Sequence, residues 1–125
     1  MHSETVNKYF ITIDNGGTNT KAVIFNLQGV QISESSFPTP RLELKRRFRE
    51  VDMDDMWKAI CDSISSAIQL AQIDPKYIVG ISTVGHGKGV YLIDKDGCPV
   101  RNGILSTDSR ANLFAKKFDS VSKEI

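Results

Sequence analysis

Three β-rich runs separated by short turns open the chain, and they constrain the fold more than any other feature of the sequence. The runs cover residues 9–13, 21–25 and 30–35. Each connection between them is short and contains glycine, which suits a tight reversal of the backbone. The sequence therefore predicts a three-stranded antiparallel meander.

One strongly periodic helix is predicted next. Apolar residues recur at i, i+3, i+4 and i+7 over residues 53–71. Asp52 is a favourable N-cap residue, and the Asp-Pro pair at 74–75 stops the pattern. Trp57 and Cys61 belong to the apolar stripe, so we expect both side chains to lie in the core.

The second half of the chain adds strands and a further helix. Residues 77–82 form a nearly continuous apolar run, of the kind buried on both faces of a sheet. Residues 89–93 and 102–105 are typical of shorter strands, and a helical pattern starts at 109 or 110 and runs close to the end. This order predicts an α/β fold with a mixed sheet and helices on its faces. The 125 residues suffice for one core.

Composition and charge argue against several classes of function. Sixteen basic and fifteen acidic residues leave a formal charge of +1, so there is no electrostatic case for binding nucleic acid or an anionic membrane. No apolar run approaches membrane-spanning length, and no apolar leader segment opens the chain. Cys61 and Cys98 do not form a metal-type pair, so we expect reduced thiols and a cytoplasmic protein.

The first connection, "DNGGTNTK" at residues 14–21, has the composition of a phosphate-binding turn. Gly16 and Gly17 let an anion approach the backbone, whose successive N–H groups can form an anion-binding nest. Asp14 would repel phosphate unless a cation stood between them, so its presence favours Mg²⁺. An ordinary Asn-Gly hairpin turn would explain the glycines equally well. Side chains able to contact phosphate oxygens follow the glycines, namely Thr18, Asn19, Thr20 and Lys21.

Two later stretches carry polar side chains that suit a sugar. In residues 80–89, glycines surround His86 and Lys88 directly after a predicted buried strand, where α/β sheets place ligand-binding loops. Asp108 and Arg110 follow a predicted short strand and could exchange hydrogen bonds with sugar hydroxyls. Purely structural roles remain open for these residues: a core histidine at position 86 and a helix N-cap near position 108.

These stretches, in this order and with the helix start "EVDMDDMW" between them, resemble the N-terminal portion of FGGY carbohydrate kinases. The resemblance runs from Tyr9 to about Lys117. The combination "GKG…LIDK…ILS.D.R" is most similar to the L-xylulose (3-keto-L-gulonate) kinase branch. It implies the ribonuclease H-like fold of the actin-like ATPase superfamily. It also implies transfer of the γ-phosphoryl group of ATP to a hydroxyl of a ketose or keto-acid. A fragment of a ROK-type hexokinase is the alternative, but the later stretches suit it less well.

The resemblance also implies roles for individual residues. Asp14 would help to hold Mg²⁺ through water, and Lys21 replaces a basic residue of some relatives. The family pattern W-x-D-x-R is matched at Asp108 and Arg110, although Ser106 replaces its tryptophan. Lys88 is expected to contact the sugar from the composition of its loop alone. Two further sets of residues match loops of the family. The residues expected to face the γ-phosphate are Asn15, Gly16, Gly17, Thr18 and Asn19. The residues expected to contact the sugar are His86 and Gly87.

FGGY kinases are several times longer than this chain and have two actin-like domains with the active site between them. The aspartate that serves as their general base has no match here by motif. We therefore expect residues 1–125 to be a truncated, N-terminal part of the first domain, inactive alone and prone to self-association through an exposed apolar face. A non-catalytic module that binds ATP or sugar remains an alternative.

Overall fold

The computed structural model describes residues 7–121. Its first three strands, β1 (Tyr9–Asn15), β2 (Asn19–Asn26) and β3 (Gln31–Pro38), form an antiparallel meander, so this prediction is confirmed. In β1 and β2 alternate residues are apolar and buried, because successive side chains of a strand point to opposite faces. The register places Ile11 opposite Ile24 and Ile13 opposite Ala22, on the face that becomes the core.

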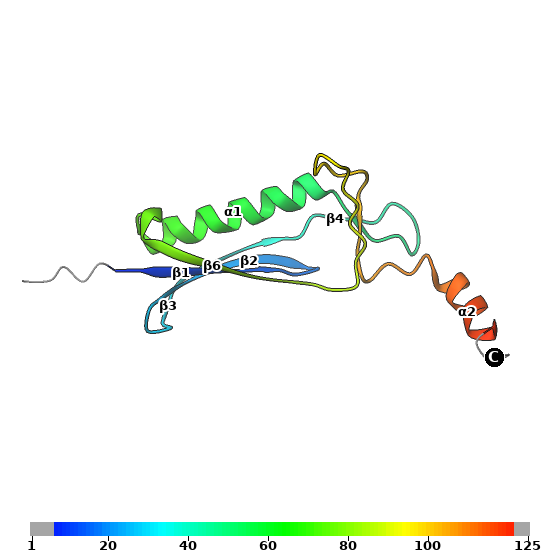
Figure 1. The fold of residues 1–125 in the computed structure, drawn as a ribbon, viewed down its shortest axis with the longest axis horizontal. Helices are drawn as coiled ribbons and strands as arrows, with labels where there is room; N and C mark the ends of the chain where they lie inside the picture. The colour runs from blue at the N-terminus through cyan, green and yellow to red at the C-terminus, as the bar shows by residue number, and fades with distance from the viewer. Residues whose placement is uncertain (1–6, 122–125) are drawn as a thin grey trace, which may run out of the picture.

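The main sheet is completed by β6 (Ile78–Gly85), which pairs parallel to β1 and gives the order β3-β2-β1-β6. Parallel neighbours need a crossover connection. Helix α1 (Met53–Ala71) lies across one face of the sheet within that connection (Figure 1). The carboxyl ends of β1 and β6 therefore lie at the same end of the sheet as the start of α1. The predicted mixed α/β sheet is confirmed.

Helix α1 begins where the sequence predicts. The carboxylate of Asp52 accepts hydrogen bonds from the N–H groups of Asp54 at 2.9 Å and Asp55 at 3.1 Å. These bonds satisfy donors that the first helical turn leaves unpaired. The helix ends at Gln72, which has a left-handed backbone with φ of 54°. Pro75 then starts a single 3₁₀ turn, Pro75–Tyr77, rather than stopping α1 itself.

The core lies between α1 and the sheet. Ala67 of the helix packs against Ile11, Ala22 and Ile24. The side chains that border this cluster are only partly buried: Tyr9, Ile64, Ile68, Ala71, Ile73 and Ile78.

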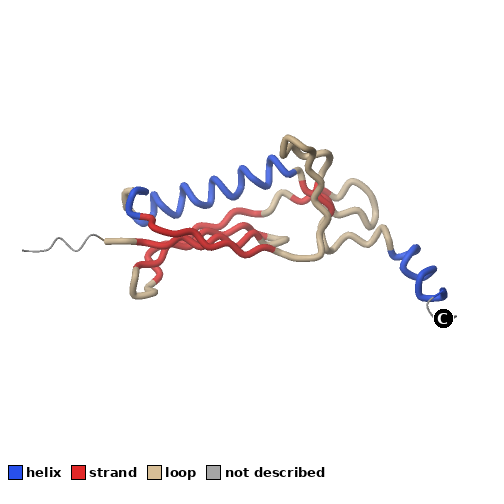
Figure 2. Tube along the Cα trace, viewed as in Figure 1, coloured by secondary structure: helices blue, strands red, loops and turns tan. Residues whose placement is uncertain are grey.

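A second, smaller sheet consists of β4 (Arg41–Leu42), β5 (Glu50–Val51) and β7 (Gly103–Ile104). It lies beyond the end of the main sheet, and α2 (Asn112–Val121) extends away from both (Figure 2). The predicted last helix is therefore present, and its continuation past residue 121 lies outside the described residues. Helices were predicted on the faces of the main sheet; in the part that the structure describes, α1 covers one face. None of the helices within residues 7–121 is long and apolar enough to cross a membrane.

The strand predicted over residues 89–93 does not form. Val90 and Ile93 make isolated bridges instead, to Ile104 and Pro99 respectively. Gly97 turns the chain with φ of 81°, and the following partner, Pro99, has no N–H to extend a ladder. The segment is consequently a pair of bridged loops, and only the β7 part of the predicted strand at 102–105 is regular.

Two predictions of burial are wrong within the described residues. Trp57 is 64% exposed, and Cys61 is partly buried rather than in the core. In β6, Ile81 is 66% and Val84 63% exposed. The wrong predictions for α1 and for β6 have the same cause. Strand β6 lies at the edge of the sheet, so no described element covers its free side or the adjoining half of α1. Hydrophobic periodicity identifies the inward stripe but not whether a partner covers it.

Candidate functional site

The hairpin between β1 and β2 is held together by its own residues. Asn15 pairs with Thr20, and the N–H of Gly16 donates to the carbonyl of Asn19 at 3.0 Å. The hydroxyl of Thr20, a fully buried residue, donates to Asn15 Oδ1 at 3.2 Å. Asn15 Nδ2 contacts Met56 Sδ of α1 at 3.5 Å. The side chains of Asn15 and Thr20 are therefore engaged inside the protein, although the sequence suggested both as phosphate contacts.

The tip of this hairpin is open. Among the described residues, the N–H groups of Gly17 and Thr18 donate to no backbone acceptor. Thr18 and Asn19 are exposed, and a Cβ atom added to Gly17 would meet nothing within 4 Å. Adjacent free N–H groups on an accessible turn are an anion-binding arrangement. The tip thus presents backbone donors that an anion could approach.

Thr39 fixes the tip from the end of β3. Its N–H donates to the carbonyl of Thr18 at 2.8 Å, and its hydroxyl donates to the carbonyl of Gly16 at 2.7 Å. Thr39 is only 5% exposed. Pro38 and Pro40 flank it, and their fixed φ angles restrict the backbone on both sides. Two carbonyl groups of the tip are thereby engaged by Thr39, while the N–H groups of Gly17 and Thr18 keep no backbone partner among the described residues.

Asp14 and Lys21 are cross-strand partners at the base of the hairpin. Asp14 is exposed, whereas Lys21 Nζ lies 3.1 Å from Glu34 Oε1 on β3. Ion pairs between exposed side chains contribute little stability, so a phosphate could compete with Glu34 for Lys21. The structure therefore leaves the Asp14 carboxylate open and Lys21 paired within the sheet.

The residues present fit a magnesium ion that arrives with a nucleotide. Within residues 7–121 no three His, Cys, Asp or Glu side chains converge into a metal site. Mg²⁺ in nucleotide sites keeps several waters and uses one or two carboxylates together with substrate phosphates. The exposed carboxylate of Asp14, in the same hairpin as the free N–H groups of the tip, suits that donor set.

The parallel pairing of β1 with β6 brings the second predicted stretch beside the hairpin. Gly85 is the partner of Asn15 in the ladder. The carbonyl oxygen of Asn15 accepts a hydrogen bond from the N–H of His86 at 3.1 Å and contacts its ring Nδ1 at 3.0 Å. A carbonyl oxygen only accepts, so Nδ1 carries the proton. We refer below to residues 85–89 as the glycine loop.

The other ring nitrogen of His86 is also engaged. Nε2 forms a short hydrogen bond with the hydroxyl of Tyr91, and the two rings meet edge to face with centroids 5.9 Å apart. Burial raises the pKa of Tyr91, so the hydroxyl stays protonated and donates a hydrogen bond to Nε2. Neither ring nitrogen of His86 is left for the sugar hydroxyl that the sequence suggested.

Lys88 is the exposed cation of the glycine loop. Its backbone is left-handed with φ of 64°, a conformation that costs a residue with a Cβ about 1–2 kcal/mol. Gly87 and Gly89 flank it. In the part of the chain that the structure describes, no ion pair or hydrogen bond engages its ammonium group. The loop thus presents an unpaired positive charge to solvent.

The third predicted stretch forms a cluster around a buried glutamate. Arg110 donates from Nε and Nη2 to the two carboxylate oxygens of Asp108, at 2.8 and 2.7 Å, and from Nη2 to Glu50 Oε1 at 2.7 Å. The N–H of Arg49 donates to Asp108 at 2.7 Å, and Arg101 pairs with Glu50 at 2.8 Å. The side chains of Glu50 and Asp108 are 5% and 4% exposed. Protein donors therefore occupy most of the Asp108 carboxylate.

Charge pairing keeps this cluster ionised. Hydrogen bonding to the Arg110 guanidinium holds the pKa of Asp108 far below its ordinary range, and it also lowers the pKa of Glu50 although burial acts in the opposite direction. The same bond to Asp108 raises the pKa of Arg110. Within residues 7–121, no hydrogen bond or ion pair joins the cluster to the hairpin. Arg110 also lies over the Phe48 ring at 3.9 Å, and its Nη1 makes no hydrogen bond to a described residue.

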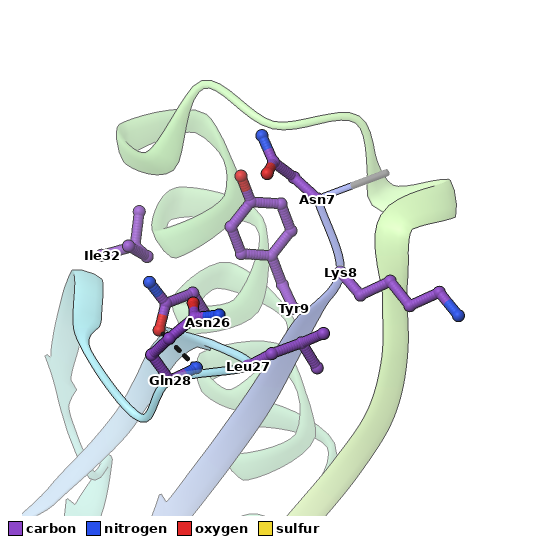
Figure 3. Close-up of a pocket in the computed structure, with 7 residues that line it drawn as sticks. All are labelled: Asn7, Lys8, Tyr9, Asn26, Leu27, Gln28 and Ile32. Carbon is purple, nitrogen blue, oxygen red and sulfur yellow. Dashed lines mark hydrogen bonds between the residues drawn. The ribbon is translucent and has the colours of Figure 1, made fainter. Parts of the chain in front are cut away.

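A shallow pocket lies at the opposite end of the sheet, where β1 starts and β2 turns into β3 (Figure 3). Tyr9 and Leu27 line it, and the only hydrogen bond drawn there joins the N–H of Gln28 to Asn26 Oδ1 within the turn. It contains none of the groups gathered at the hairpin. We therefore place the candidate site at the hairpin and the glycine loop.

Comparison with known proteins identifies the family. The profile of the FGGY family of carbohydrate kinases, N-terminal domain, matches residues 9–124. The chain belongs to the FGGY family of carbohydrate kinases. This membership confirms the resemblance drawn from the sequence and favours FGGY enzymes over ROK-type hexokinases.

Individual FGGY relatives agree. A probable L-xylulose kinase from Pasteurella multocida is 34% identical over 110 residues, which cover 88% of this chain and 23% of that protein. An L-xylulose/3-keto-L-gulonate kinase from Escherichia coli is 30% identical over 111 residues, 89% of this chain and 22% of the relative. The crystal structure of gluconate kinase from Lactobacillus acidophilus superposes with a TM-score of 0.83 at 25% identity, over 91% of this chain and 23% of that one.

The comparisons also bear on the fold and on the length of the FGGY chain. The structural likeness confirms the fold class, the actin-like ATPase fold of FGGY sugar kinases. The chain spans about a quarter of the length of the relatives it matches.

Three residues of this FGGY domain escaped the sequence interpretation. Thr39 and Glu50 act through partners far along the chain, and Tyr91 acts through His86, five positions away. For Thr39 the two flanking prolines are a usable local signal. Glu50 has none, because its partners Arg101 and Arg110 are 51 and 60 positions away.

Proposed function

We propose that this chain supplies the phosphate-binding hairpin and part of the sugar-binding surface of an ATP-dependent carbohydrate kinase. Residues 1–125 are then the N-terminal part of the first actin-like domain. The parallel pairing of β1 with β6 carries the proposal, because it sets the hairpin tip and the glycine loop side by side through Asn15 and His86. A phosphoryl donor and its acceptor have to meet in such a place.

The hairpin is assigned to the nucleotide. The free N–H groups of Gly17 and Thr18, with the exposed side chains of Thr18 and Asn19, would hold the terminal phosphate. Asp14 would hold Mg²⁺ through its water shell, and the bound ion would neutralise charge on the transferred group. Lys21 would join the phosphate contacts by leaving Glu34.

The glycine loop is assigned to the acceptor. Gly87 offers backbone groups, Lys88 an unpaired ammonium, and Arg110 a free Nη1 on the neighbouring cluster. A ketose such as L-xylulose is the substrate we propose, or a related keto-acid whose carboxylate would pair with Lys88. Two observations support this choice: the unpaired charge of Lys88 and the names of the relatives described above.

The general base is not assigned to any residue of the chain. Asp108 is held as a carboxylate by Arg110 and the N–H of Arg49, so it is poorly placed to take a proton from a sugar. We propose that the isolated chain binds ligands without transferring phosphate. Turnover of ATP and L-xylulose by this chain in an assay coupled to ADP release would overturn that part.

Isothermal titration calorimetry of the purified chain tests the proposal directly. Mg-ATP and L-xylulose are titrated separately into the parent chain and into Asp14→Asn and Asp96→Asn. Asp96 is the matched control because it is an exposed aspartate in a distant turn. We expect Asp14→Asn to weaken Mg-ATP binding at least tenfold, with sugar binding unchanged, and Asp96→Asn to alter neither. Binding of sugar alone, with no response to nucleotide, would support a non-catalytic module instead.

A further inference from the structure

We propose that Tyr91 is a positioning residue: its hydroxyl holds His86, and through His86 it fixes the glycine loop against the phosphate-binding hairpin. The roles of the hairpin and the glycine loop in ligand binding rest on the proposed function, whereas the contact between Tyr91 and His86 does not depend on it. Tyr91 lies outside all three predicted ligand-binding stretches, and among the described residues its link to the hairpin runs through His86.

Three hydrogen bonds surround the backbone N–H and the imidazole of His86. His86 is bound to Asn15 twice, through its N–H and through Nδ1–H, and to Tyr91 once through Nε2. A neutral imidazole has one donor and one acceptor nitrogen, so these contacts use both. The ring is fixed in one tautomer and one orientation. His86 therefore acts as a tether between the loop and the end of β1.

Tyr91 is held by the packing of its ring and by the backbone beside it. Its ring occupies space that two glycines leave free: a Cβ on Gly89 would lie 2.6 Å from the ring, and a Cβ on Gly103 would lie 2.5 Å from it. Gly103 belongs to β7 and is buried. The segment is also anchored by reciprocal backbone hydrogen bonds of 2.9 Å between Val90 and Ile104. Tyr91 is consequently held at the small sheet by contacts that do not involve His86.

The contact between His86 and Tyr91 encloses Lys88. His86 and Tyr91 are five positions apart, so their hydrogen bond closes a small ring of chain that contains Lys88. A left-handed backbone at Lys88 is unfavourable and persists where the surroundings impose it. Closure between His86 and Tyr91 supplies that constraint. The tyrosine hydroxyl thus determines where the unpaired ammonium of Lys88 is presented relative to the hairpin.

The variant Tyr91→Phe separates this role from simple packing. Phenylalanine keeps the ring that fills the space beside Gly89 and Gly103, so the change removes only the hydroxyl. Tyr77→Phe is the matched control, because Tyr77 lies in the 3₁₀ turn before β6 and has no contact with His86. Both variants are compared with the parent chain by ¹⁵N NMR of the histidine ring and by hydrogen exchange of the His86 amide.

We expect Tyr91→Phe to shift the ¹⁵N resonance of His86 Nε2, which loses its donor, and to speed exchange of the His86 amide at least tenfold. Tyr77→Phe should change neither. An unchanged Nε2 resonance and unchanged exchange in a folded Tyr91→Phe chain would overturn the inference. A calorimetric arm with L-xylulose should give about tenfold weaker binding for Tyr91→Phe. If the parent chain binds no sugar, the proposed function fails, while the NMR result still decides the role of Tyr91.

Discussion

The hydroxyl of Thr39 donates to the carbonyl of Gly16 at 2.7 Å, across 23 positions of sequence. Together with the bond from the Thr39 N–H to the Thr18 carbonyl, it engages two acceptors of the hairpin tip. With these acceptors engaged, the tip keeps its free backbone donors, which are what an anion requires.

We therefore expect Thr39→Val to damage both stability and nucleotide binding. Valine keeps the shape of the side chain but leaves the Gly16 carbonyl without its partner, which should cost about 1–3 kcal/mol of unfolding free energy. Urea denaturation measures this cost, and calorimetry should show weaker Mg-ATP binding. Thr107→Val, at an exposed position with no side-chain hydrogen bond among the described residues, should be nearly neutral in both.

The adjacent glycines of the hairpin should respond differently to alanine. A Cβ at Gly16 would lie 2.8 Å from the carbonyl oxygen of Asn19, whereas one at Gly17 would meet nothing within 4 Å. Gly16→Ala should therefore lower the free energy of unfolding by about 1–3 kcal/mol, because the hairpin backbone has to shift. Gly17→Ala should fold with nearly unchanged stability and still weaken Mg-ATP binding, because its methyl group occupies the approach to the free N–H groups. Equal effects of both variants on stability would contradict this account.

Stability should fall in acid because of the buried cluster at Arg110. The pKa values of Glu50 and Asp108 are lowered by the fold, so the unfolded chain binds more protons at acid pH and protonation favours unfolding. Their contribution is complete above the ordinary carboxyl pKa values, near pH 4 to 5, and is lost as the pH falls below them. Urea denaturation between pH 7 and pH 3 should show this loss. The variant Glu50→Gln should be less stable at pH 7 and show a shallower decline, whereas Glu34→Gln, at an exposed glutamate of β3 outside the cluster, should follow the parent curve.

The free edge of β6 should bring two copies of the chain together. The strand has eight residues and no charge, and edge strands of this kind pair with other chains unless charges prevent it. A second copy can pair antiparallel about a two-fold axis, which also covers the apolar groove between Ile81 and Trp57. We expect a concentration-dependent dimer in light scattering coupled to size exclusion. Ile81→Lys should shift it to monomer, and Leu70→Lys, equally exposed on α1, should not. A monomeric parent chain at all concentrations would contradict this prediction.

Two features that depend on local sequence were predicted correctly, the antiparallel meander and the start of α1. The meander comes from β-rich runs and their turns, and the start of α1 from Asp52, whose hydrogen-bond partners are two and three residues away. The position of the glycine loop after a strand was also predictable, because a strand end has to be followed by a loop. Even so, the sequence did not reveal that Asn15 and His86 would meet.

What sequence could not supply is the choice of partner for each polar group. His86 had the composition of a ligand contact, but Tyr91 and Asn15 occupy its ring. Asp108 similarly looked available, yet donors from Arg49 and Arg110 occupy most of its carboxylate. Trp57 has the periodicity of a core residue and still faces solvent. Each outcome depends on which groups the fold brings together or leaves uncovered, and local pattern does not specify that.

The contacts around Asn15 also set an order of assembly. Its bond to Thr20 joins residues five positions apart, while its contact with His86 spans 71. Closing a short loop costs far less entropy, and strand pairing between distant segments forms more slowly. We therefore expect the hairpin to form before β6 pairs with β1. The glycine loop would then take its place last, and the site would be completed from its phosphate side.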